Sequence, residues 1–119
     1  MKDNQIITAK ASFVHTSPRK LRLVAKAVSA LTPEKAVWYL KMINKRAARP
    51  LLLVMQQAIA NAKNNFAANP GLLMIESLQV MEGPRGAKRT DKSHGARFDR
   101  GVKRRRMAHI LVKLSVREK

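Results

Sequence analysis

Three segments of the chain alternate apolar and polar residues with a period of two, which is the pattern of half-buried β-strands. They cover residues 6–14, 72–82 and 108–116. The last is the most regular, because every second residue from Ala108 to Val116 is apolar. We therefore predict one strand near the start of the chain and two towards its end.

The same alternation predicts which side chains share a face of each strand. In the first strand, Ala9, Ala11 and Phe13 are expected on one face, opposite polar neighbours. In the second strand, one face is expected to hold Leu72, Met74, Leu78 and Val80, and the other to hold Leu73, Ile75 and Met81.

Three helices are predicted between the first and second strands, from apolar residues spaced three and four apart. The first two each begin with a capping residue and then a proline, which suits the first helical position: Ser17-Pro18 and Thr32-Pro33. The third covers about residues 44–65 and contains Pro50, so either its regular part starts near Arg49 or its first turns are kinked. Trp38 and Tyr39 are expected in the core or at its edge.

The order of one strand, three helices and two strands indicates an α+β fold, with three helices packed on a three-stranded antiparallel sheet. The length of 119 residues fits a single domain over residues 1–119. The last two strands pair most simply as a long, extended β-hairpin. Its basic loop, at about residues 83–107, is expected to protrude, since a loop of this length is usually functional.

The net charge of the chain indicates what kind of partner it binds. The chain carries 25 Lys and Arg against 7 Asp and Glu, a net charge of +18. Residues 1–82 have a net charge of +8 and residues 83–119 a net charge of +10, so the last third holds more than half of it. Such a domain repels itself and gains most from a dense polyanion, of which nucleic acid is the commonest.

The predicted loop is the strongest candidate for contact with nucleic acid. Arginine outnumbers lysine there, and arginine binds phosphate with two parallel hydrogen bonds and stacks on bases. A solvated basic loop is the plain alternative, but ten cations in so short a stretch favour binding. The candidate residues are Arg85, Lys88, Arg89, Lys92, Arg97, Arg100, Lys103, Arg104, Arg105 and Arg106.

The start of the first helix is a second candidate, because a helix N-terminus attracts phosphate. Arg19, Lys20 and Arg22 stand beside it. An ordinary capped helix with a polar outer face explains the same residues, so both interpretations stay open. Asn64 also has two interpretations, as an RNA contact or as part of the helix end.

Other chemistry is not indicated by the sequence. There is no cysteine, so disulfides and thiolate metal sites are excluded. The three histidines, His15, His94 and His109, lack ligand spacing, and we expect His109 to lie against phosphate or solvent. No acid–base pair or nucleophile motif is recognisable, so we expect neither an enzyme nor a cofactor. The longest apolar run, Pro50–Met55, is too short to span a bilayer.

Four stretches of the chain resemble a known family. They are "TSPRKLRLVAKAV", "KRAARPLLLVMQQAIANAKNN", "MEGPRGAKR" and "KRRRMAHILVKLS". In this order they are similar to bacterial-type members of the universal large-subunit ribosomal protein twenty-two family. The resemblance extends from about Ile6 to Arg117.

The resemblance implies a structural, non-enzymatic component of the cytoplasmic ribosome. Its partners would be large-subunit (23S-type) rRNA, neighbouring large-subunit ribosomal proteins and, where the hairpin lines the exit tunnel, the nascent peptide. It implies a role in subunit assembly, no membrane association and no homo-oligomer. On the globular part, the residues it places at rRNA are Ser17, Arg19, Lys20, Arg22, Lys63 and Asn64. On the hairpin, they are the ten cations named above and His109.

The hairpin tip departs from the family pattern. The expected tip residues that line the tunnel are Ala87, Lys88, Arg89, Thr90, Lys92 and His94. Where the family commonly has Met-Lys-Arg, with a methionine linked to macrolide response, this chain has Ala87. The usual "RTSHI" is replaced by "RRMAHI", which retains His109 and Ile110.

Three other classes of protein are alternatives to a ribosomal component. A free-standing architectural nucleic-acid-binding protein also accounts for the charge. A cationic membrane-surface protein is disfavoured, because the basic segment has no amphipathic helical stripe. An RNA-processing enzyme is disfavoured by the missing acid–base residues.

Overall fold

The central strand of the sheet is the last one in the sequence. In the computed structural model, β5 (Arg106–Val116) lies between β1 (Ile6–Val14) and β2 (Leu73–Arg85) and is antiparallel to both. The predicted hairpin between the last two long strands is therefore confirmed. The structure describes residues 6–86, 89–91, 101–103 and 106–116.

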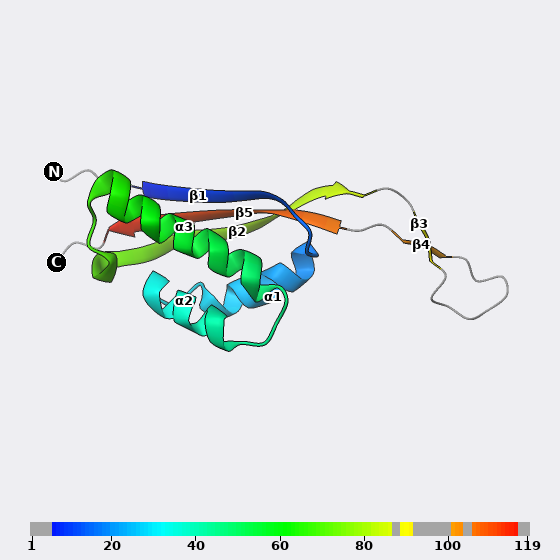
Figure 1. Ribbon diagram of the computed structural model, residues 1–119, viewed down its shortest axis with the longest axis horizontal. Helices are drawn as coiled ribbons and strands as arrows, with labels where there is room; N and C mark the ends of the chain where they lie inside the picture. The colour runs from blue at the N-terminus through cyan, green and yellow to red at the C-terminus, as the bar shows by residue number, and fades with distance from the viewer. Residues whose placement is uncertain (1–5, 87–88, 92–100, 104–105, 117–119) are drawn as a thin grey trace.

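Three helices cover one face of this sheet (Figure 1): α1 (Pro18–Val28), α2 (Pro33–Met42) and α3 (Ala48–Phe66). A short 3₁₀ turn, η1 (Pro70–Leu72), leads from α3 into β2. α3 packs against β1 and β5, α1 packs against β2, and α2 packs on α3. The predicted α+β architecture, with three helices on a three-stranded antiparallel sheet, is confirmed.

The core lies between the helices and the inner face of β5. Ala108, Ile110, Val112 and Leu114 are all fully buried, as the alternation predicted. The helices contribute Leu21, Val28, Leu51 and Met55, also fully buried. Each fully buried Leu, Ile, Val or Met side chain stabilises the fold by about 1.5–3 kcal/mol. Several contacts are made by alanines, among them Ala36, Ala58 and Ala62, which let the elements approach closely.

A β-bulge in β2 reverses the face of its side chains. Ile75 lies opposite Leu114 and Ser77 opposite Lys113, so Glu76 is an additional residue without a partner position. Such an extra residue changes which side chains point inwards. Leu73 and Ile75 therefore share the core face with Leu78 and Val80, whereas Met74 is exposed. The predicted grouping of Leu72 and Met74 with Leu78 and Val80 was wrong for this reason.

A second bulge, in β1, turns Phe13 out of the core. Ala11 pairs with Ile110 and Val14 with Ala108, so two residues of β1 face the single His109. Phe13 adopts a positive φ of 57° and is exposed, which corrects its predicted place beside Ala9 and Ala11. Its backbone N–H donates a hydrogen bond of 3.1 Å to Nδ1 of His109. The two rings meet edge to face, with centroids 5.1 Å apart.

The helices begin close to the predicted positions, but some of their side chains differ from the prediction. α3 begins at Ala48, so Pro50 lies in its first turn, where a missing backbone N–H breaks no hydrogen bond. Ser17 and Thr32 occupy the N-cap positions of α1 and α2, but neither side chain makes a capping hydrogen bond. Trp38 and Tyr39 are exposed rather than in the core.

Side chains from the helices hydrogen-bond to both edge strands. On β2, the guanidinium of Arg22 donates two hydrogen bonds, of 3.1 and 3.3 Å, to the carbonyl of Val80. On β1, the amide of Asn61 donates one of 3.3 Å to the carbonyl of Thr8. Each edge strand therefore has one backbone carbonyl that accepts a hydrogen bond from a helix side chain.

The hairpin continues as a ribbon beyond the helices. The β2–β5 ladder extends to the pair Arg85 and Arg106. Further out, β3 (Arg89–Asp91) pairs with β4 (Gly101–Lys103) in antiparallel register. The molecule measures 67 × 26 × 19 Å along its principal axes, and the ribbon lies along the long one (Figure 1). Part of the predicted loop is thus regular β-structure.

Gly83 lies close against the backbone of the facing arm of the hairpin. A Cβ added there would lie 3.1 Å from the backbone carbonyl carbon and oxygen of Met107. Both atoms belong to the facing strand and cannot move without distorting the ladder. We expect Gly83→Ala to lower the free energy of unfolding by about 1 kcal/mol, in a urea titration.

Gly71→Ala is the matched control for this substitution. Its added Cβ would meet only Asn69 Oδ1, at 3.5 Å, which is an ordinary contact. Its free energy of unfolding should stay within about 0.5 kcal/mol of the unchanged protein. Equal effects of the two substitutions would contradict the close approach at Gly83.

Candidate nucleic-acid interface

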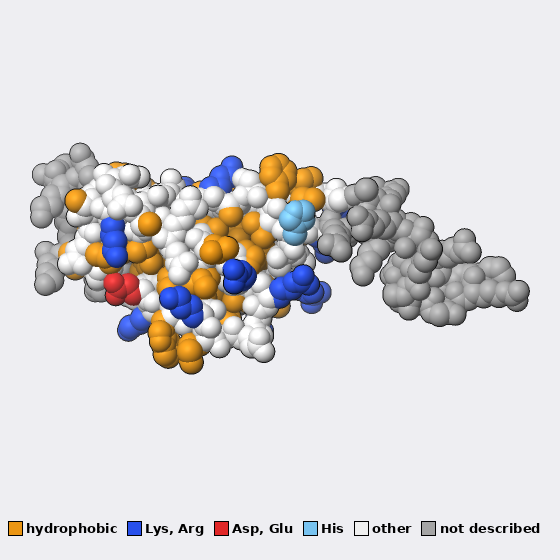
Figure 2. Space-filling view, in the orientation of Figure 1, with side chains coloured by type: hydrophobic (Ala, Val, Ile, Leu, Met, Phe, Trp, Pro, Cys, Tyr) orange, Lys and Arg blue, Asp and Glu red, His pale blue; other side chains and the backbone are white. Residues whose placement is uncertain are grey.

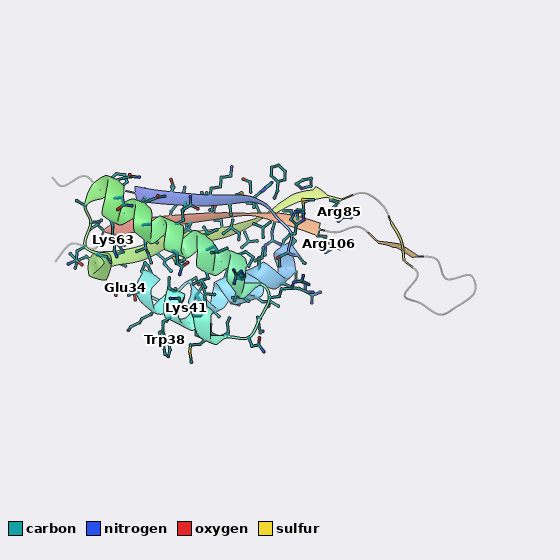
Figure 3. The ribbon with its side chains drawn as sticks, in the orientation of Figure 1. Glu34, Trp38, Lys41, Lys63, Arg85 and Arg106 are labelled. Atoms are coloured by element: carbon teal, nitrogen blue, oxygen red, sulfur yellow. The ribbon has the colours of Figure 1, made fainter. Side chains whose placement is uncertain are left out.

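Like charges face each other across the base of the hairpin. Arg85 lies directly opposite Arg106, and both side chains are exposed (Figure 3). The next pair along the ribbon is Arg89 opposite Lys103. Like charges at directly opposite positions destabilise an antiparallel pair. An anion that binds between the arms would remove this repulsion, so the register itself favours a polyanionic partner.

The start of α1 adjoins the base of the hairpin. Pro18, the first residue of α1, lines a small cavity together with Gly83, Arg85, Arg106, Met107 and one acid, Glu82. The two candidate regions predicted from separate parts of the sequence are therefore neighbours in space. Cations from both can act on the same length of phosphate backbone.

Residues at the start of α1 differ in how far their side chains are already engaged in hydrogen bonds within the protein. Arg19 and Lys20 are exposed, and the half-buried Ser17 makes no capping hydrogen bond with its hydroxyl. Arg22 is exposed too, but its Nε and one terminal nitrogen donate to Val80. A guanidinium has five N–H donors, so donors remain on Arg22 for an outside partner.

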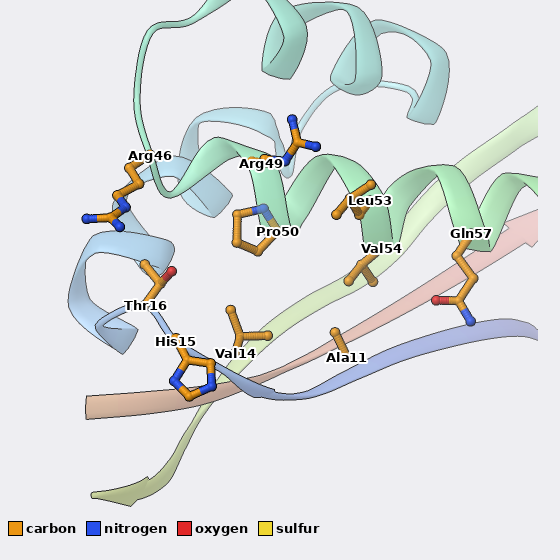
Figure 4. Close-up of a pocket in the computed structure, with 10 residues that line it drawn as sticks. All are labelled: Ala11, Val14, His15, Thr16, Arg46, Arg49, Pro50, Leu53, Val54 and Gln57. Atoms are coloured by element: carbon orange, nitrogen blue, oxygen red, sulfur yellow. The ribbon is translucent and has the colours of Figure 1, made fainter. Parts of the chain in front are cut away.

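A cavity between α3 and the end of β1 adds residues that the sequence analysis missed. It has a volume of about 420 Å³. Figure 4 shows Arg46 and His15 at one end of it and Gln57 at the other, with Arg49 on α3 between them. The wall is apolar and includes Pro50, Leu53, Val54 and Val14. The guanidinium of Arg46 and the imidazole of His15 beside an apolar wall suit a phosphate joined to a base, whose flat faces are apolar.

The signal for this cavity was present in the sequence but ambiguous. "KRAAR", residues 45–49, is a basic stretch at the start of a helix, and such a stretch is usually a solvated face. Only the fold brings it beside His15, which is more than thirty residues earlier in the chain. The chemistry of the site thus depends on the contact between α3 and β1.

Lys63 and Asn64 lie at the other end of the domain. Both are exposed near the end of α3, and Figure 3 shows Lys63 away from Arg85 and Arg106. Figure 2 shows Lys and Arg side chains spread over the helical face, with apolar side chains exposed between them. The predicted residues of the globular part therefore do not form one cluster but follow the length of the domain.

His109 has a role within the protein. Its Nδ1 accepts the hydrogen bond from the backbone of Phe13, so in the neutral ring the proton is on Nε2. The ring is half-buried against Phe13. Its expected contact with phosphate remains a prediction, and only Nε2 is left to make it.

The other predicted contact and tip residues belong to the outer part of the hairpin. Arg89, Thr90 and Lys103 are placed by the pairing of β3 with β4. The remaining ones lie outside the described residues: Ala87, Lys88, Lys92, His94, Arg97, Arg100, Arg104 and Arg105.

No helix among the described residues combines the length and the apolar character needed to cross a membrane. In the same part of the chain, no group of three or more His, Cys, Asp or Glu side chains is placed to hold a metal ion.

These features define a class, that of small basic α+β domains with an extended, charged β-ribbon. Residues 9–115 match the family model described as ribosomal protein L22p/L17e. The chain belongs to this family of ribosomal proteins, which are structural and not enzymatic.

Curated relatives agree with this membership. "Large ribosomal subunit protein uL22" of Rubrobacter xylanophilus is 39% identical over 110 residues, covering 92% of this chain and 84% of the relative. The protein of the same name from Mycoplasma capricolum is 35% identical over 107 residues, covering 90% and 94%. That of Petrotoga mobilis is 37% identical over 116 residues, covering 96% and 74%. The family predicted from the four sequence stretches is confirmed.

The opposed arginines give a testable consequence for stability. Arg106→Glu would place a carboxylate opposite Arg85 and replace repulsion with attraction. We expect the free energy of unfolding of the free protein to rise by about 0.2–1 kcal/mol at low salt, measured by urea denaturation. This increase in the free energy of unfolding should become smaller at high salt, because salt screens the charge pair.

Lys10→Glu provides the matched control. It makes the same charge change on an exposed strand position, but Lys10 pairs with the uncharged Leu111. A similar gain from Lys10→Glu would mean that net charge alone, and not the pairing of Arg85 with Arg106, limits the stability of the free protein.

Proposed function

We propose that this protein is a structural component of the large ribosomal subunit and acts by binding large-subunit rRNA. The observation that carries this proposal is the register of the ribbon, which pairs like-charged positions: Arg85 opposite Arg106 and Arg89 opposite Lys103. A free protein gains nothing from such pairings. They become favourable only when phosphate groups lie between or beside the arms.

The globular part binds rRNA along its length. The start of α1 adjoins the base of the ribbon, and the cavity with Arg46 and Arg49 adjoins the end of β1. Lys63 and Asn64 extend the contact to the far end of α3. Most of these groups carry charge without base specificity, so they position the protein on the RNA and do not read its sequence.

The hairpin inserts into the subunit. Its arms cannot bury an apolar core of their own, because residues 83–106 hold ten cations and few large apolar side chains. RNA packed around them supplies the missing partner. By resemblance to the family, the tip lines the peptide exit tunnel and meets the nascent peptide, and the neighbours are other large-subunit proteins. Binding on this scale supports assembly of the subunit.

Salt dependence tests whether charge drives the binding. If about eight cations contact phosphate, the slope of log K against log salt should be about −6 to −7 with a fragment of large-subunit rRNA. Arg85→Ala with Arg106→Ala should reduce the slope by about 1–2. Lys10→Ala with Lys26→Ala removes the same charge away from the interface and should change it less. A slope near −2 would contradict the proposed role of the ribbon.

Sedimentation of a tagged copy from cells tests the location on the ribosome. After a high-salt wash, we expect the protein to stay with the large subunit, because buried contacts resist salt that screens exposed charge pairs. Release into the top fractions of the gradient would instead favour a free-standing architectural nucleic-acid-binding protein.

A further inference from the structure

Trp38 stands at a groove that the core does not use. It is the only tryptophan of the chain, and 66% of its surface is exposed. Figure 3 shows it projecting from α2, away from the sheet. A tryptophan this exposed presents a large flat apolar surface on which a partner can pack.

The groove lies between α2 and α3 and has a volume of about 450 Å³. This is within the range of about 300–1,000 Å³ that is typical of pockets for small ligands. Its floor includes Val37 and Ile59, both half-buried against the core, so its shape is fixed by the fold. Trp38 thus forms one wall of an apolar slot.

The charged groups of the groove are arranged around this slot. Lys41 on α2 and Lys63 on α3 line it from its two helices, and both are exposed. Gln56 adds an amide, which offers a donor and an acceptor. Glu34, one turn before Trp38, is the single acid and can accept a hydrogen bond from an amino group.

We propose that this groove binds one unpaired base of RNA, stacked on Trp38, with the adjoining phosphates on Lys41 and Lys63. The inference rests on the proposed rRNA binding and names a site within it. Base stacking on an aromatic ring is the usual way in which proteins hold unpaired nucleotides. Gln56 and Glu34 lie where they can meet the hydrogen-bonding edge of the base.

The charge of the groove favours RNA over an apolar peptide as the occupant. The two lysines that line the groove attract phosphate and would be left unpaired by an apolar chain.

The fluorescence of Trp38 reports directly on the groove. In the full-length protein, we expect a short single-stranded oligoadenylate to quench this fluorescence, because a stacked base quenches the indole. A duplex RNA of the same length should bind the basic protein without quenching, since its bases are paired and cannot enter. Equal quenching by both, or by neither, would overturn the proposal.

Substitutions separate stacking from charge. Trp38→Ala should weaken oligoadenylate binding about tenfold, measured by anisotropy of a labelled oligonucleotide. Met42→Ala is the control, because Met42 is equally exposed, at 66%, on the same helix but does not line the groove. Lys41→Ala with Lys63→Ala should reduce the quenching, whereas Lys26→Ala, on α1, should not. Equal loss with Met42→Ala would overturn the assignment to Trp38.

The outcomes distinguish this site from the function on which it rests. If single-stranded RNA binds with the expected salt slope but Trp38→Ala has no effect, the groove proposal fails and rRNA binding stands. If neither RNA binds, both fail. If an acidic amphipathic peptide protects Trp38 from acrylamide and RNA does not, the groove belongs to a neighbouring protein.

Discussion

The pairing of β5 with both of its neighbours is the interaction on which the rest of the structure depends. The inner face of this one strand supplies the centre of the core, through residues such as Ile110 and Leu114. Its first residue, Arg106, already belongs to the charged base of the ribbon. The ladder that holds the sheet together therefore also sets which cations oppose each other, so core packing and the presentation of charge cannot vary independently.

Hydrophobic periodicity predicted every major element of the fold, because burial on one face leaves a regular trace in a sequence. It could not predict which side chains face the core beyond a bulge, because the extra residue shifts the alternation by one position. Glu76 and Phe13 each stand at an extra residue, and nothing local distinguishes them from ordinary strand positions. The bulges follow from how β1 and β2 fit against β5, which is a property of three segments far apart in the chain.

The candidate interface, too, was only partly predictable from the sequence. Composition alone pointed to a polyanion, and the cations of the hairpin were visible as a run. The opposition of Arg85 and Arg106 needed the register, and the cavity beside His15 needed the contact of α3 with β1. Trp38 was expected in the core or at its edge, whereas its position on α2 leaves it on the surface. A single sequence indicates which chemical groups are available, and the tertiary fold decides which of them meet.

The side chains that reach the edges of the sheet have a consequence for the life of the protein before assembly. A three-stranded sheet has two open edges, and an open edge can accept a strand from another molecule. Arg22 and Asn61 each occupy a carbonyl on one of these edges. They each occupy one acceptor in the row that an incoming strand would need. Another strand could therefore pair with either edge only by breaking a hydrogen bond from a helix side chain.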